Sequence, residues 1–69
     1  MEEDSDIALD IISNKIAEIT NIYATSKKAE EISICKEKLN LLEKMQQEIY
    51  MNNKKIITKV LEERKKGIL

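Results

Sequence analysis

The chain has 69 residues, of which 42% are hydrophobic and 36% charged, and its formal net charge is −1. It contains no histidine, no proline, one cysteine and one glycine. These counts exclude a structural zinc site, a Ser-His or Cys-His nucleophile and an internal disulfide. We therefore expect one small domain, residues 1–69, that is not an enzyme and uses neither a metal nor a cofactor.

The first helix is predicted from residue 5 to about residue 24. Apolar residues recur there at alternating intervals of three and four, which places them along one side of a helix. Asp4 and Ser5 are good N-cap residues, and acidic side chains at the start suit the positive end of the helix dipole. The stripe that we expect to face the core consists of Leu9, Ile12, Ile16, Ile19 and Tyr23.

A change of register predicts a turn at residues 24–27. If the first stripe were extended it would place Ser26 and Glu30 in the seam, whereas the next apolar series begins at Ile32. Thr25 or Ser26 can cap a new helix at this point. The alternative is one continuous helix with a local slip in phase.

The second helix is predicted over residues 27–66, because a heptad pattern runs through the whole stretch. Asn52 and Asn53 favour a break, since asparagine prefers caps and turns to helix interiors, and a break there would give a three-helix bundle. The heptad frame nevertheless continues unshifted, so we prefer an all-α helical hairpin with a short first and a long second helix. The a positions are Ile32, Leu39, Gln46, Asn53 and Val60, and the d positions are Cys35, Leu42, Ile49 and Ile56.

The two predicted helices differ in length by a factor of two. At about 1.5 Å per residue the first spans roughly 30 Å and the second roughly 60 Å. The first would cover the second only to about residue 46, and an apolar stripe left exposed beyond it normally marks an interaction surface. We therefore expect a homodimer of the coiled-coil or four-helix-bundle type, or docking on another protein. The predicted partner-binding residues are Ile49, Asn53, Ile56, Ile57, Val60 and Leu61.

Charge changes from acidic to basic along the chain. Residues 1–23 carry six acidic side chains and one lysine, whereas residues 54–69 carry six basic and two acidic ones. Lysines on a helix can neutralise nucleic-acid phosphates, but Glu62 and Glu63 dilute this basic segment. Nucleic-acid binding is therefore the alternative function. Its predicted contacts are Lys54, Lys55, Lys59, Arg64, Lys65 and Lys66.

The preferred function is that of a small regulatory or adaptor protein that acts through helix–helix contacts, with itself and with another protein. No apolar run is long enough to span a membrane, and the acidic start is unlike a signal peptide, so we expect a cytoplasmic protein. No small-molecule substrate is indicated. Isoleucine, lysine and asparagine are frequent in this chain, and their codons are AT-rich. This composition favours a bacterium or phage with an AT-rich genome as the source.

Overall fold

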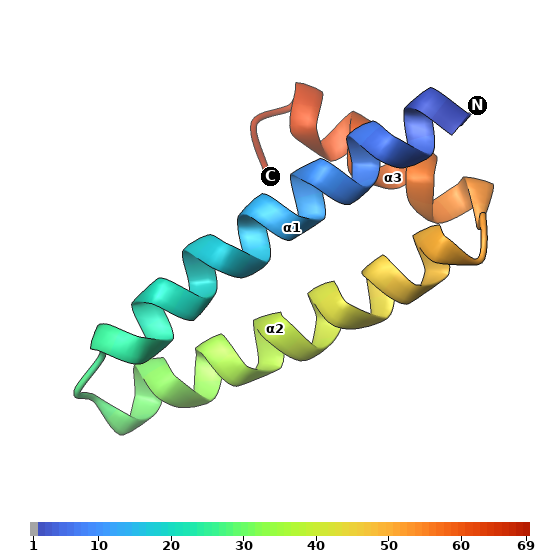
Figure 1. Cartoon of the computed structure of the whole chain (residues 1–69). Helices are drawn as coiled ribbons and strands as arrows, with labels where there is room; N and C mark the ends of the chain where they lie inside the picture. The colour runs from blue at the N-terminus through green and yellow to red at the C-terminus, as the bar shows by residue number, and fades with distance from the viewer. Residues whose placement is uncertain (1) are drawn as a thin grey trace.

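The computed structural model describes residues 2–69, which form three helices. They are α1 (Glu2–Thr25), α2 (Ala29–Tyr50) and α3 (Lys54–Lys65). α1 and α2 run antiparallel as a hairpin, and α3 folds back across the N-terminal half of α1 (Figure 1). The molecule is elongated, with extents of 41 × 23 × 15 Å. The all-α prediction is confirmed, and the alternative of three helices describes the chain better than the preferred hairpin with one long helix.

α1 agrees closely with the first predicted helix, but it begins earlier. Because it begins at Glu2, Asp4 and Ser5 lie within the helix and are not its N-cap. Their position near the positive end of the helix dipole remains favourable for the Asp4 carboxylate. At the other end the Thr25 hydroxyl donates to the carbonyl of Asn21 at 3.0 Å.

The turn between α1 and α2 lies at residues 26–28, which rules out one continuous helix here. The predicted capping residues, Thr25 and Ser26, are wrong. Lys28 is the N-cap of α2, with an extended backbone and no side-chain capping bond. The Ser26 hydroxyl instead donates to the Glu31 carboxylate at 2.7 Å and so ties the turn to the first turn of α2.

The single helix expected over residues 27–66 is wrong, because α2 ends at Tyr50. Asn52 has a φ of 62°, in the left-handed region that asparagine tolerates better than most residues. Its N–H donates to the carbonyl of Ile49, and the N–H of Asn53 donates to that of Glu48, both at 2.9 Å. This pair of bonds is the Schellman motif, which closes a helix by satisfying its last carbonyls.

Asn53 also begins the next helix. As the N-cap of α3 its side-chain oxygen accepts from the N–H of Lys55 at 3.1 Å. Its amide nitrogen donates to the Glu48 carboxylate at 2.8 Å, across the turn. Asn52 and Asn53 together end α2, and Asn53 starts α3, so the turn is encoded without a glycine or a proline.

A second Schellman motif ends α3. Gly67 has a φ of 77°, and its N–H donates to the carbonyl of Arg64 at 3.1 Å. The N–H of Ile68 donates to the carbonyl of Glu63 at 2.9 Å. The chain is thereby turned back toward α1, and Leu69 packs on the core. Arg64 Nη1 donates to the carbonyl of Leu69 at 2.9 Å.

Side chains from all three helices form one core. Ile12 and Val60 are the largest fully buried side chains, and both have no exposed surface. On α3 the other buried residue is Ile57, whereas the predicted d residue Ile56 is half-buried; the predicted a residue Val60 keeps its place in the core. The core consists of Ala8, Ile12, Ile19, Cys35, Leu42, Ile49, Ile57 and Val60.

Two long side-chain hydrogen bonds link α1 to α2 and to the turn that follows it. The hydroxyl of Ser5 and the amide of Gln46 form long hydrogen bonds across the hairpin, to Asn52 and to Ser13 respectively, both at 3.4 Å. Between residues 2 and 69, no helix has the length and hydrophobicity that a membrane crossing requires.

Candidate protein-binding face

The stripe predicted to bind a partner is largely buried within the single chain. Ile49, Ile57 and Val60 belong to the core, while Ile56 and Leu61 are half-buried against it. Asn53, the sixth member, is half-buried as the N-cap of α3. Because α3 turns back, α1 covers the residues that a straight helix would have left in water. These six residues therefore do not form an uncovered apolar stripe.

Other large hydrophobic side chains remain exposed, and several of them follow one line along α2. Ile34 is 52% exposed and Leu41 is 61% exposed. They lie two turns apart, and Lys38 and Met45 follow them at helical spacing on the same side of α2. The remaining exposed hydrophobic side chains are Ile7, Ile22, Tyr50, Met51 and Ile68.

The C-terminal residues extend this line. A shallow depression of about 360 Å³ lies between α1 and α2, and Leu41, Met45 and Ile68 contribute to its walls. We call Ile34, Lys38, Leu41 and Met45, together with Ile68, the apolar face. The other residues of the depression are Lys15, Ile19, Lys38, Leu42 and Leu69.

The sequence partly indicated this face. Leu41 and Met45 broaden the apolar side of the second predicted helix beyond what a two-stranded seam requires. Ile34 lies seven residues before Leu41 and belongs to the same line, but periodicity alone does not separate a broad core face from an exposed one. Whether such a residue is exposed depends on the position of α1.

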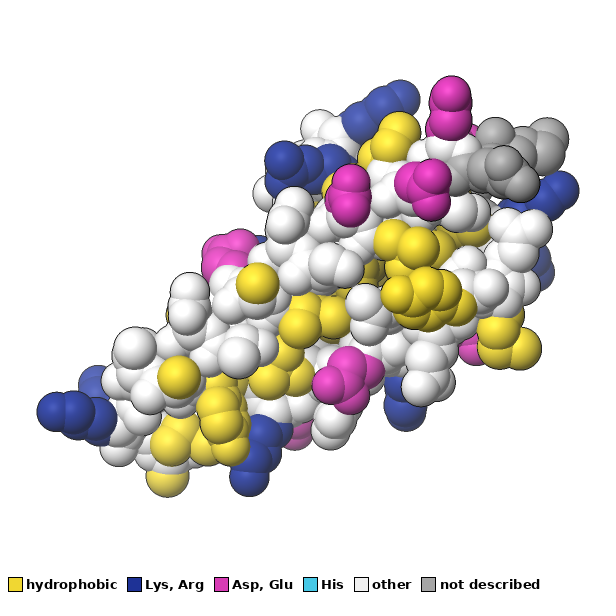
Figure 2. Space-filling model, in the orientation of Figure 1, with side chains coloured by type: hydrophobic (Ala, Val, Ile, Leu, Met, Phe, Trp, Pro, Cys, Tyr) yellow, Lys and Arg dark blue, Asp and Glu magenta, His cyan; other side chains and the backbone are white. Residues whose placement is uncertain are grey.

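The opposite charges of the two chain ends lie near one another in space. In Figure 2 acidic side chains gather over the N-terminal part of α1, and basic ones gather near α3. Hydrophobic side chains are also visible along the groove between α1 and α2 in this view. Among the residues described, the salt bridge found is that between Lys15 and Glu18, at 3.7 Å within α1. The attraction between the two ends is therefore diffuse and exposed to solvent.

All six basic residues predicted to contact nucleic acid are exposed. Lys55 and Lys59 lie with Thr58 and Glu62 around a shallow surface on α3. The structure therefore presents this basic segment to solvent, but beside the acidic start of α1, which reduces its attraction for phosphate.

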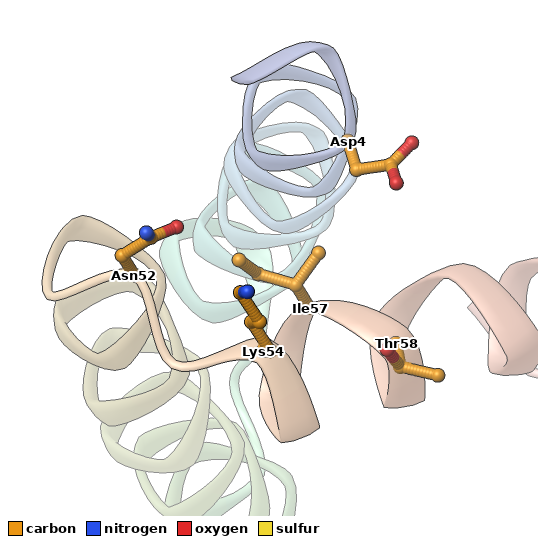
Figure 3. Close-up of a pocket in the computed structure, with 5 residues that line it drawn as sticks. All are labelled: Asp4, Asn52, Lys54, Ile57 and Thr58. Carbon is orange, nitrogen blue, oxygen red and sulfur yellow. The ribbon is translucent and has the colours of Figure 1, made fainter. Parts of the chain in front are cut away.

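A smaller pocket lies where the start of α1 meets the turn between α2 and α3 (Figure 3). It has a volume of about 180 Å³ and is lined by Asp4, Asn52, Lys54, Ile57 and Thr58. In Figure 3 the Asp4 carboxylate points away from both Asn52 and Lys54, so the polar groups do not converge on one point. Ligand pockets usually measure about 300–1,000 Å³ and hold convergent polar groups. This pocket therefore has neither the size nor the chemistry of a ligand site.

Within the part of the chain that the structure describes, no three His, Cys, Asp or Glu side chains come together as a metal site. Cys35 is a free cysteine buried in the core. Because other core residues enclose its side chain, Cys35 is not presented to a substrate or a partner. The comparison with protein-family models, with curated proteins and with solved structures finds no match for this chain.

Proposed function

We propose that this chain is a small non-enzymatic adaptor or regulatory protein that binds another protein chain through the apolar face. The observation that carries the proposal is the exposure of Ile34 and Leu41, each more than half exposed beside a core that is already closed. Contiguous exposed apolar side chains on a small protein usually mark a site of protein interaction.

The apolar face has the shape and chemistry that suit a helix. Its residues follow one line along α2, and the depression beside Leu41 gives that line a hollow in which a side chain can sit. Amphipathic helices bind such grooves through apolar residues spaced by three, four and seven positions. Lys15 and Lys38 line the same depression, and their aliphatic stems add to its apolar surface.

A photo-crosslinking amino acid at position 41 tests this proposal. Introduced in the cell that makes the protein, it should form a covalent adduct with a protein, because the partner would lie directly against this position. The matched control is position 43, which is exposed on the opposite side of α2 and should form no adduct. Equal labelling from the two positions, or none from position 41, would contradict the proposal.

Nucleic-acid binding by α3 is the second candidate, supported by the exposure of its six basic side chains. It predicts retention on a DNA column at low salt that falls steeply as salt rises, because bound lysines release counterions. Replacing Lys55 and Lys59 with glutamate should abolish the retention. The same change at Lys27 and Lys28, in the turn between α1 and α2, should preserve most of it. A wild-type chain that passes through the column at low salt would exclude this candidate.

A further inference from the structure

We infer that the protein bound by the apolar face is a second copy of this chain, with the two α2 helices antiparallel. The inference rests on the proposed function, since it names the partner of the same face. It is carried by the charges that flank Ile34 and Leu41 on α2.

The apolar face can be described as a second heptad seam, turned by one residue from the core seam. In this frame Ile34 and Leu41 take the d positions, whereas Cys35 and Leu42 hold them in the core frame. Lys38 and Met45 take the a positions. Antiparallel helices pack an a residue of one chain against a d residue of the other. In this register Ile34 meets the partner's Met45, and Leu41 meets the partner's Lys38.

This register also brings opposite charges together. The g positions that border the seam on the side away from α1 are Glu37 and Lys44, and both are exposed. In an antiparallel pair g positions border g positions of the other chain. When Leu41 lies against the partner's Lys38, Glu37 lies beside the partner's Lys44, and the two-fold axis repeats the pair.

A parallel arrangement does not offer this complementarity. There each g position faces an e position of the other chain, and the e positions of this seam are Cys35 and Leu42. Both are buried in the core of their own chain, so Glu37 would have no opposite charge to meet. The distribution of charge therefore favours the antiparallel pair.

Lys38 is the one charged residue in the centre of this seam. Its aliphatic stem can cover Leu41 of the other chain while the ammonium group reaches water at the edge. A polar residue at such a position lowers affinity but restricts the register and the orientation of the helices. We therefore expect a dimer that dissociates on dilution.

Charge reversal tests the register directly. The dissociation constant of the dimer is measured by sedimentation equilibrium over a dilution series, and circular dichroism checks that each variant remains helical. Glu37→Lys or Lys44→Glu alone places like charges together twice per dimer and should weaken the dimer roughly tenfold. The double variant restores two opposite pairs and should recover the wild-type constant to within about threefold.

The matched control uses Lys36 and Glu43, which have the same spacing but lie on the opposite side of α2. Lys36→Glu and Glu43→Lys, singly or together, should leave dimerisation unchanged. A wild-type chain that stays monomeric at all concentrations, or a double variant that does not recover, would overturn the inference. A monomer that still crosslinks from position 41 to a different protein would overturn the second copy as partner but retain the proposed function. An adduct of two copies supports both.

Discussion

Replacing Ile12 with alanine is expected to remove most of the stability of this fold. Ile12 has no exposed surface and lies in the core that all three helices share. Truncating a buried isoleucine to alanine costs about 2–5 kcal/mol, through lost hydrophobic contact and the cavity left behind. A single core in a chain of this size supplies only about 3–5 kcal/mol in total. We therefore expect a chain that is largely unfolded at 25 °C, measured by urea denaturation followed by circular dichroism.

The matched control for this change is Ile7→Ala on the same helix. Ile7 loses the same atoms but is 50% exposed, so its truncation leaves no enclosed cavity. We expect a loss of less than about 1 kcal/mol, in the range of ordinary surface changes. Equal denaturation midpoints for the two variants would contradict the assignment of Ile12 to the core.

Replacing both Asn52 and Asn53 with alanine is expected to join α2 and α3 into one helix. Alanine at position 52 adopts the left-handed conformation only at a cost of about 1–2 kcal/mol, which destabilises the turn. Alanine at position 53 removes the N-cap of α3, which costs about 1 kcal/mol more. Alanine also has the highest helix propensity, so the same change favours the continuous helix. Ile57 and Val60 would then leave their place on α1.

The chain with the joined helix should assemble by exchanging α3 between copies. In each copy the straightened helix exposes Ile57 and Val60 and leaves their binding surface on α1 uncovered. The exposed residues of one copy can therefore pack on α1 of the other, which is domain swapping. We expect light scattering to give the mass of a dimer. Adding Glu37→Lys should not lower this mass, because the exchanged helix and not the apolar face holds the two copies together. Asn52→Gly keeps a residue suited to positive φ and should behave as the wild type. A double-alanine variant whose mass falls on dilution and with Glu37→Lys in the same way as that of Asn52→Gly would show that core packing alone enforces the turn.

Periodicity identified much of the helical hairpin before any tertiary arrangement was known. The predicted stripe of α1 contains Ile12 and Ile19, and the predicted d positions of α2 are Cys35, Leu42 and Ile49; all five are buried. These residues were predictable because the angular position of a side chain around a helix depends only on its place in the sequence. The turn near residue 26 was predictable for the same reason, since the apolar face changes direction there.

The second turn was not resolved by the same method. Asn52 and Asn53 indicated a break, but the apolar positions on either side of them fit a single heptad frame, which is typical of one continuous helix. On α3 the residue buried beside Val60 is Ile57 and not Ile56, and a difference of one position is too small for the spacing of apolar residues to settle. What decides between one long helix and two is the area of apolar surface that α1 can cover, and that depends on distances across the bundle.

The helical character of the chain, the place of its first turn and the inward side of each hairpin helix follow from the sequence alone, because they are local consequences of residue spacing. Which apolar residues remain exposed depends instead on how the three helices pack together. Because the chain turns back at Asn52, Ile57 and Val60 are buried, while Ile34 and Leu41 stay more than half exposed because no helix of the same chain covers them. Local spacing fixes direction around a helix, whereas exposure depends on what lies opposite, and that is a property of the whole fold.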